Sequence, residues 1–358
     1  MGGLGDYDLK AARNEYFFRT PAVMTSVLKD ERDRPIFYLF FNCSLFVAAG
    51  SVVIHHTNSH AVGVVYFVLL FTQFFERFVL ALHNATHRSI FVTPLANQLP
   101  EFVMAPFFGI PAGLYRTHHI SIHHVHGNMF PWDVSSTEPY QRDRVLHLIF
   151  YCINFVFCSL ATIPLSFLKQ GKAPQAAYFV SVLFCNILAI SSLSSLYPVP
   201  VFWMLTAPLC LAPFLLAYGN YCQHIFIDPD NPESDFGMTY SLVDCAKNQM
   251  VFNDGYHIEH HINSVMHWTE LPSRFQKRLP DYKEQNALIF RGHVSFFIIG
   301  KWVFTQNYDC LYQNLVQLNE PKQSRDEIEK MLRKRLKPVS RWGDGAVIKE
   351  QQTCLASQ

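Results

Sequence analysis

The feature that most constrains how this chain folds is a set of apolar runs long enough to cross a lipid bilayer. A membrane-spanning helix needs about 20 predominantly apolar residues, with a range of roughly 17–25. The runs of this length are Ile36–Ile54, Ala61–Leu82, Ala176–Leu196 and Val199–Tyr218. The short loop HHTNSH joins the first two, and Tyr197-Pro198 joins the last two. The sequence therefore predicts two transmembrane hairpins.

Other apolar stretches are interrupted or flanked by charge. Leu99–Tyr115 contains Pro106 and Pro111. Val145–Leu168 has arginines before it and lysines after it, and cationic flanks at both ends indicate that a segment begins and ends on one side of the membrane. We therefore predict two membrane-surface helices here and a further interfacial helix at Leu288–Phe304. The alternative is a protein with six spans.

Basic residues also orient the predicted hairpins. Lys29, Arg32 and Arg34 precede the first span and Arg88 follows the second, and cytoplasmic flanks are enriched in such residues. With four spans, both termini lie in the cytoplasm. We expect a multi-pass integral membrane protein, in the endoplasmic reticulum if the source is eukaryotic and in the inner membrane if it is bacterial.

Composition agrees with a membrane setting. Half of the residues are hydrophobic and 16% are charged, whereas about a quarter are charged in ordinary soluble domains. A net charge of +1 gives no electrostatic reason to expect nucleic acid binding. The nine cysteines form no C-x-x-C motif, so we expect free thiols rather than a disulfide framework.

Histidines gather in three short motifs. They are His83 and His87 in HNATH, His119, His123 and His124 in HISIHH, and His257, His260 and His261 in HIEHH. A spacing of four places two imidazoles on one helical face, which is a common metal-chelating arrangement. Adjacent histidines point about 100° apart on a helix, so all three members of a motif are easier to use if two metals are present.

A polar pair follows directly on the last predicted span. Asn220 and His224 in GNYCQH are also four residues apart. They could cap the helix, but the predicted topology places them on the same side as the three motifs. Nine histidines and one asparagine are too many ligands for one ion and suffice for two. Imidazole suits Fe, Zn, Cu or Ni, so spacing alone does not name the metal.

Other histidines are weaker candidates. His118 and His126 lie beside the second motif, and His55, His56 and His60 lie on the far side of the predicted membrane, where we expect no metal role.

Together these motifs resemble the histidine boxes of the integral-membrane di-iron fatty acid desaturases and their hydroxylase relatives. NYCQH is similar to an additional Asn-x-x-x-His of the acyl-CoA desaturase branch. The likeness covers roughly Ile36–Pro272. It implies an all-α membrane protein with four transmembrane helices in two hairpins, interfacial helices and a cytoplasmic histidine-rich cap that holds two iron ions.

The resemblance also implies how the ligands divide. One iron is expected to take His83, His87, His119, His124 and His261. The other is expected to take His123, His224, His257 and His260, with Asn220 binding directly or through water.

The implied reaction is O2-dependent removal of two hydrogens from a fatty-acyl or related lipid chain. The chain contains no HPGG motif of a fused cytochrome b5 domain and no iron–sulfur cysteine pattern, so we expect an external electron donor, cytochrome b5 or a ferredoxin with its reductase. Two alternatives stay open. One is a hydroxylase on the same scaffold, and the other is a zinc-dependent membrane hydrolase or a receptor with histidine-bound zinc.

Polar residues near the motifs are further candidates. Glu76 lies seven residues before His83 on about the same helical face. Glu76 and Glu259 could each orient a ligand imidazole, and an ion pair or solvation is the alternative. Trp132 and Asp133 could contact a substrate head group or anchor a loop at the membrane interface.

The chain is expected to divide into three parts. Residues 1–35 form a cytoplasmic N-terminal segment, residues 36–304 the membrane domain, and residues 305–358 a charged cytoplasmic tail. Within the tail, Ser324 and Glu327 have the spacing of a capping box at the start of a charged helix.

Overall fold

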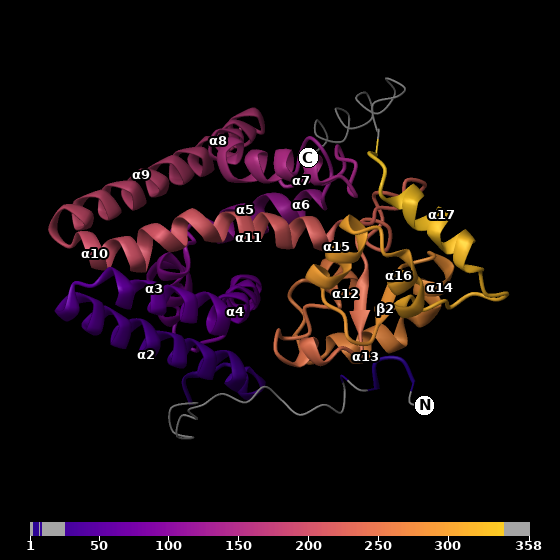
Figure 1. Cartoon of the computed structure of the whole chain (residues 1–358), viewed down its shortest axis with the longest axis horizontal. Helices are drawn as coiled ribbons and strands as arrows, with labels where there is room; N and C mark the ends of the chain where they lie inside the picture. The colour runs from indigo at the N-terminus through magenta and orange to yellow at the C-terminus, as the bar shows by residue number, and fades with distance from the viewer. Residues whose placement is uncertain (1–2, 7, 9–25, 340–358) are drawn as a thin grey trace.

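The computed structural model describes residues 3–6, 8 and 26–339, so parts of the predicted N-terminal segment and C-terminal tail lie outside the described residues. The chain forms a bundle of long helices beside a cap of shorter elements (Figure 1). Within the described part, the helical runs long and apolar enough to cross a membrane are Glu31–Thr57, His60–His87, Val145–Lys169, Ala173–Leu196 and Pro198–Gln223. These runs support an integral membrane protein.

The first hairpin consists of two long helical runs. After the short η2 (Glu31–Asp33), α2 (Arg34–Thr57) forms the first run. The second run is continuous and comprises α3 (His60–Leu69), the π-helix η3 (Leu70–Phe75) and α4 (Glu76–His87). Asn58, with a left-handed φ of 48°, ends α2, so the turn is shorter than the predicted HHTNSH loop.

The second hairpin consists of α9 and a run that ends close to the cap. α9 (Ala173–Leu196) is followed by α10 (Pro198–Val201), the π-helix η9 (Phe202–Thr206) and α11 (Ala207–Gln223). The two hairpin turns meet at the end of the bundle that lies away from the cap (Figure 1). There Trp203 Nε1 donates to His60 Nδ1 at 3.0 Å, which ties one hairpin to the other.

A further long helical run has almost the predicted bounds but is long enough to cross a membrane. α7 (Val145–Ile153), the π-helix η8 (Asn154–Cys158) and α8 (Ser159–Lys169) are continuous, and Pro164 does not interrupt them. The sequence predicted an in-plane helix here. By length and composition the structure makes this run a fifth candidate for crossing the membrane.

The predicted surface helix at Leu99–Tyr115 is wrong as a continuous element. The segment follows η4 (Ala96–Gln98) and contains the π-helix η5 (Pro100–Met104) and η6 (Ala105–Phe108), and then the chain turns at Gly109 with a φ of 74°. A Cβ atom on Gly109 would lie 2.2 Å from the carbonyl oxygen of Pro208 in α11. A residue without a side chain is therefore required where this segment crosses α11.

The segment after that turn carries the second histidine motif. It comprises α5 (Tyr115–His118), the π-helix η7 (His119–His123) and α6 (His124–His126).

The cap contains a small sheet, so the all-α prediction is incomplete. β1 (Ser241–Val243) pairs in parallel with β2 (Ile289–Arg291), with Ser241 opposite Ile289. The helices around it are η10 (Ala246–Gln249), α12 (His257–Ile262), α13 (Leu271–Lys277), α14 (Leu279–Glu284), α15 (Phe296–Phe304), α16 (Tyr308–Asn314) and α17 (Arg325–Arg335). The predicted helix at Leu288–Phe304 is therefore a strand followed by α15.

The capped helix near the C-terminus is confirmed. Ser324 accepts a hydrogen bond from the backbone of Glu327, and the side chain of Glu327 accepts one from the backbone of Ser324.

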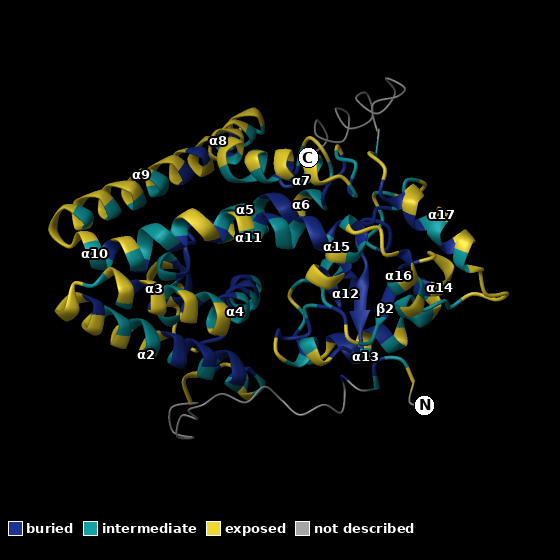
Figure 2. Cartoon of the chain, viewed as in Figure 1, coloured by how far each residue is buried: buried dark blue, intermediate teal, exposed yellow. Residues whose placement is uncertain are grey.

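Burial distinguishes the bundle from the cap. In Figure 2 the outer faces of α3 and α9 carry many exposed residues, whereas β2 is buried. The exposed side chains on these helices include Val65, Val68, Phe184 and Leu188. A large apolar surface of this kind needs an apolar environment, which a bilayer provides.

Candidate metal centre

The fold brings the histidine motifs together from four separate places in the sequence. His83 and His87 lie in the last turns of α4, and the second motif lies on η7 and at the start of α6. His224 ends α11, and the third motif forms α12 in the cap. All nine predicted histidine ligands therefore meet where the bundle faces the cap.

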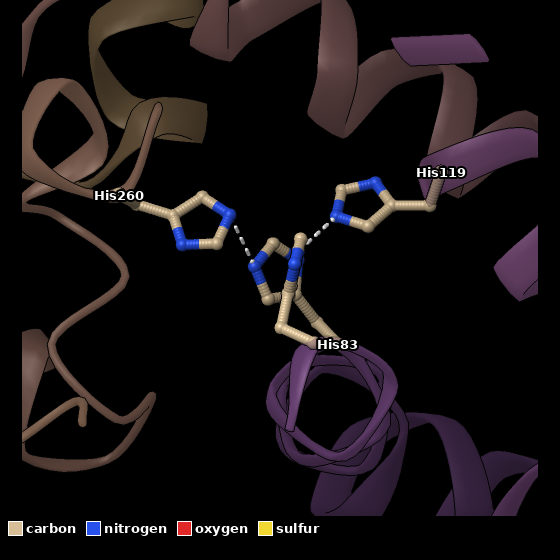
Figure 3. Close-up of side chains that lie close together, drawn as sticks. His83, His119 and His260 are labelled. Carbon is tan, nitrogen blue, oxygen red and sulfur yellow. Dashed lines mark hydrogen bonds between the residues drawn. The ribbon is translucent and has the colours of Figure 1, made fainter. Parts of the chain in front are cut away.

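The first histidine group is a chain of Nε2 atoms in short contact. The distances are 2.9 Å from His87 to His119, 3.2 Å from His119 to His124, 3.0 Å from His124 to His260 and 2.9 Å from His260 to His83. Figure 3 shows His83, His119 and His260 turned toward one central space. We call these five residues the first histidine group.

Hydrogen bonds alone do not account for these contacts. A neutral imidazole has one donor nitrogen and one acceptor nitrogen. Each Nε2 atom in the chain carries at most one proton, so no choice of tautomers satisfies all four contacts. A metal ion shared by unprotonated Nε2 atoms does satisfy them, and His83, His87, His119 and His260 have ligand atoms within 4.8 Å of one another.

The second histidine group contains the remaining four. His123, His224 and His261 have ligand atoms within 4.8 Å of one another. His257 Nε2 lies 3.2 Å from His261 Nε2, and the rings of His224 and His257 are 5.3 Å apart between centroids. We call His123, His224, His257 and His261 the second histidine group.

This arrangement corrects the expected division of ligands, because His260 and His261 exchange places. His257 and His261 are four residues apart on α12 and share one face, so they belong together. His260 points about 100° away from His261 and faces α4. The sequence-based division had placed His261 with His83 and His260 with His257.

Local helix geometry also explains the second motif. His119–His123 is a π-helix, in which the backbone N–H of His124 bonds to the carbonyl of His119 five residues earlier. The wider turn puts His119 and His124 on one face, where both join the first group. His123 lies between them in sequence and points into the second group.

Burial favours the neutral form of four imidazoles in this centre, and the neutral form is the one that binds a metal. Burial lowers the pKa of His257, His260 and His261 well below the ordinary value, and the neighbouring histidines lower it further. Burial likewise lowers the pKa of His224 to about 3. His224 Nε2 is buried without a hydrogen-bond partner. Neutral, buried and convergent nitrogens fit two metal ions.

Asp133 holds one of these rings in place. Its Oδ2 lies 2.7 Å from His123 Nδ1 and accepts a hydrogen bond from the backbone of Asn128 at 3.1 Å. Burial would raise the pKa of Asp133, but His123 and the hydrogen bonds from His123 and Ser135 together hold it well below the usual range. The carboxylate fixes the proton of His123 on Nδ1 and leaves Nε2 for a metal.

This geometry gives Asp133 a different place from the expected one. Asp133 is 1% exposed and contacts a histidine, whereas the sequence suggested either contact with a substrate head group or a loop anchor at the membrane interface. Trp132 is half-buried, lies 6.3 Å from the His126 ring between centroids, and is not part of the cavity wall described below.

His224 and Asn220 are positioned by backbone and side-chain groups. His224 Nδ1 lies 3.0 Å from the carbonyl oxygen of Met238, so its Nε2 faces the second group. Asn220 Nδ2 donates to the Ser135 carbonyl at 3.1 Å and to the Tyr151 hydroxyl at 2.7 Å. Only Oδ1 of Asn220 is therefore left as a ligand atom.

Glu76 and Glu259, the two carboxylates that could orient a ligand imidazole, have no recorded hydrogen bond to a histidine. Glu76 forms an ion pair with Lys247 of the cap. Glu259 is fully buried, and neither of its carboxylate oxygens accepts a hydrogen bond from a histidine. Burial raises the pKa of Glu259, and Arg278 opposes this shift.

The remaining histidines lie outside both groups. His118 packs against Phe155 with ring centroids 5.5 Å apart and faces the cavity described next. His55 contacts Tyr197 at the hairpin turns, away from the centre.

A long cavity runs beside both histidine groups. Its volume is about 680 Å³, and its wall includes His83 and His119 of the first group and His123 and His257 of the second. Along η9 and α11 the wall extends from Leu205 to Gln223, which is roughly 27 Å at 1.5 Å per residue. Most of the lining is apolar, with phenylalanine, leucine and isoleucine side chains from α8, α9 and α11.

Sequence reasoning missed Arg142 as a structural residue of this site. Its guanidinium is fully buried and donates to the carbonyl of Ile225, next to His224, at 2.9 Å. Thr137, whose carbonyl also accepts from Arg142, donates its hydroxyl to the carbonyl of His224 at 2.8 Å. In the sequence, Arg142 served only as one of the basic residues that orient the membrane segments. The local sequence does not indicate that its guanidinium donates to a carbonyl 83 residues away.

Comparison with known protein families identifies this region of the chain. The fatty acid desaturase family model matches residues 58–293, which include all the histidines of both groups. No curated protein matches the chain.

Proposed function

The chain belongs to the fatty acid desaturase family, which makes it an oxidoreductase of the desaturase type, and from this premise we propose that it introduces a double bond into an acyl chain of a lipid. In the proposed reaction, –CH2–CH2– and O2, with two electrons and two protons, give –CH=CH– and two molecules of water. The observation that carries the proposal is the pair of histidine groups on the wall of one long apolar cavity.

Two iron ions are the proposed cofactors. The first histidine group offers five Nε2 atoms and the second offers four, and Oδ1 of Asn220, one helical turn before His224, is a further candidate ligand atom. Bound iron supplies the activation of O2, and the rest of the chemistry is the positioning of the substrate. Asp133 and the Met238 carbonyl keep His123 and His224 in the tautomer that presents Nε2.

The cavity holds the chain and excludes water. Leu183 and Ile187 on α9 and Leu209 on α11 form apolar wall beyond the histidines. A methylene chain lying there passes His83, His119, His123 and His257. A cavity of this volume is within the usual range for ligand sites, about 300–1,000 Å³. Closing out water protects a reactive oxidant from side reactions.

The proposed membrane topology has four crossings and places both histidine groups on the cytoplasmic side. The rings of His123 and His224 are 5.1 Å apart between centroids. An even number of crossings must therefore separate these two residues. If α9 and the run ending in α11 both cross, the run Val145–Lys169 begins and ends on one side. The basic residues at both of its ends support this placement.

The electron donor is proposed to be external. Two electrons per turnover come from cytochrome b5 or a ferredoxin with its reductase, as the family resemblance implies.

Product analysis tests the proposed function. The full chain is expressed in a host with defined lipids, and the lipids are examined by mass spectrometry. We expect products that have lost two hydrogens. Products that have gained one oxygen instead would assign the chain to the hydroxylases on this scaffold. His260→Ala, which removes a nitrogen from the first group, serves as the inactive control.

Metal analysis of the purified protein tests the cofactor. Two irons per chain are expected, and a single zinc with full activity would contradict the assignment.

A further inference from the structure

The cavity has one polar end, formed where the bundle meets the cap. Glu76 of α4 pairs with Lys247 of η10 across this end. Next to them, Gln223 Nε2 of α11 donates to Asp254 Oδ2 of the cap at 3.1 Å. All four side chains belong to the cavity wall. The wall at the other end comes from α8 and α9 and is mostly apolar, and α9 extends away from the cap in Figure 1.

Both histidine groups also contribute residues to the cavity wall. Glu76 is seven residues, about two helical turns, before His83 on α4, and Asp254 is three residues before His257, where α12 begins. A lipid that fills the cavity with its chain at the apolar end passes the histidines and brings its head group to Glu76, Lys247, Gln223 and Asp254. We call these four residues the polar end.

The charges at the polar end nearly cancel. Apart from histidines, the charged residues of the cavity wall in the described part of the chain are Glu76, Lys247 and Asp254. The single ammonium group is already paired with Glu76. Burial, with a further contribution from Glu76, raises the pKa of Asp254 to about 7, against an opposing hydrogen bond from Gln223. The polar end therefore carries between zero and one negative charge near neutral pH.

This balance disfavours an anionic head group. A phosphate or carboxylate placed here meets two carboxyl groups and an ammonium that is neutralised by its partner. Strong phosphate sites use arginine forks or clusters of cations, and the described cavity wall has no arginine.

The same groups suit an uncharged head with hydroxyl or amide functions. Oxygens of Glu76 and Asp254 accept hydrogen bonds from such a head, and Lys247, Gln223 and protonated Asp254 donate to it.

We infer that the polar end binds the uncharged, hydrogen-bonding head group of the lipid substrate, and that Glu76, by neutralising Lys247, selects against anionic heads. This inference rests on the proposed function, because it takes the cavity as the place of the reacting chain. It assigns the substrate to lipids with hydroxyl- or amide-bearing neutral heads.

Binding of two matched probes tests the inference without relying on turnover. The probes are monostearoylglycerol and its phosphate ester, which share the acyl chain and the glycerol and differ only in the phosphate. Dissociation constants are measured on the purified, iron-loaded full chain in a neutral detergent. We expect the uncharged probe to bind at least about tenfold more tightly than the phosphate ester.

Charge variants give opposite expected shifts. Glu76→Gln frees Lys247, so affinity for the phosphate ester rises about tenfold or more and the preference narrows or reverses. Lys247→Gln leaves Glu76 without its cation, so the phosphate ester binds more weakly still. Lys322→Gln, which removes an exposed lysine paired with Glu320 outside the cavity, is the matched control and leaves both constants unchanged.

A double variant separates charge from structure, because the Glu76–Lys247 pair also joins the bundle to the cap. Glu76→Lys combined with Lys247→Glu restores an ion pair of the same net charge, and it keeps the preference for the uncharged probe. Equal or tighter binding of the phosphate ester by the unmodified protein overturns the inference. So does a preference that stays unchanged in Glu76→Gln.

The proposed reaction and the head-group preference can be disproved separately. If the uncharged probe binds preferentially but no lipid is desaturated, the inference about the head group holds and the proposed reaction fails. If acyl chains are desaturated but the phosphate ester binds better, the reaction stands and the inference fails.

Discussion

Replacing Arg142 with methionine should destabilise the protein far more than any surface change. The guanidinium is fully buried, and its donors reach six backbone carbonyls at 2.6–3.3 Å. They belong to Thr137, Glu138, Tyr140, Ile225, Arg335 and Lys337. Arg142 thus joins three segments that are distant in sequence. They are the loop after the second histidine motif, the irregular segment directly after His224, and the end of α17.

The expected magnitude follows from those carbonyls. A buried polar group left without a partner costs about 1–3 kcal/mol. Six such costs do not add, because water enters the space and the chain relaxes, so we expect a loss of about 4 kcal/mol, near the upper limit for single substitutions. At about 2 °C per kcal/mol, the lower end for domains of a few hundred residues, the melting temperature falls by about 8 °C.

Heating followed by size-exclusion chromatography in detergent measures this effect. Arg144→Met is the matched control, because Arg144 is exposed in the same loop, and it should shift the melting temperature by about 1 °C or less. Arg142→Lys should recover less than half of the loss, since an ammonium cannot reproduce the planar fork of donors. A melting temperature for Arg142→Met within about 2 °C of the control would refute the reasoning.

The remaining predictions concern the centre and its pH dependence. His224→Ala should lower iron content and activity as strongly as His260→Ala, whereas Asn220→Ala should mainly reduce turnover; elemental analysis beside product assays checks both. Asp133→Asn should reduce metal affinity or activity about 10–100-fold, because the amide cannot hold the proton of its histidine partner in the same way; full metal retention in chelator titrations would contradict this. Asp254 has a folded-state pKa of about 7, above its ordinary value of 3.8, so its contribution to stability is present at low pH and is lost as pH rises through 7. Asp254→Asn should therefore gain more melting temperature over the unmodified protein at pH 8 than at pH 5.

The long helices and the histidine motifs were predictable because their signals are local. Apolar length alone indicated the runs that became α2 and α9. A spacing of four residues indicated that His83 and His87 would share a helical face. The capping box at Ser324 is local as well, and the structure confirms it.

The elements that failed to follow the prediction depend on distant contacts. The segment at Leu99–Tyr115 breaks at Gly109 because α11 passes against it. Residues 289–291 form a strand because Ser241–Val243 lies beside them. In both cases the contacting element lies far away in the sequence, so the local residues do not indicate it.

The sequence by itself therefore determined which residue types form the centre, and the tertiary structure decided how they are used. Which group His260 joins depends on the direction in which α12 faces α4, and the helical period alone leaves that open. Asp133 is a positioning residue only because its loop folds back onto His123. Glu76 meets Lys247 only because the cap docks on the bundle. Helical periodicity acts over a few residues, whereas these pairings arise from packing between segments that are far apart in the chain.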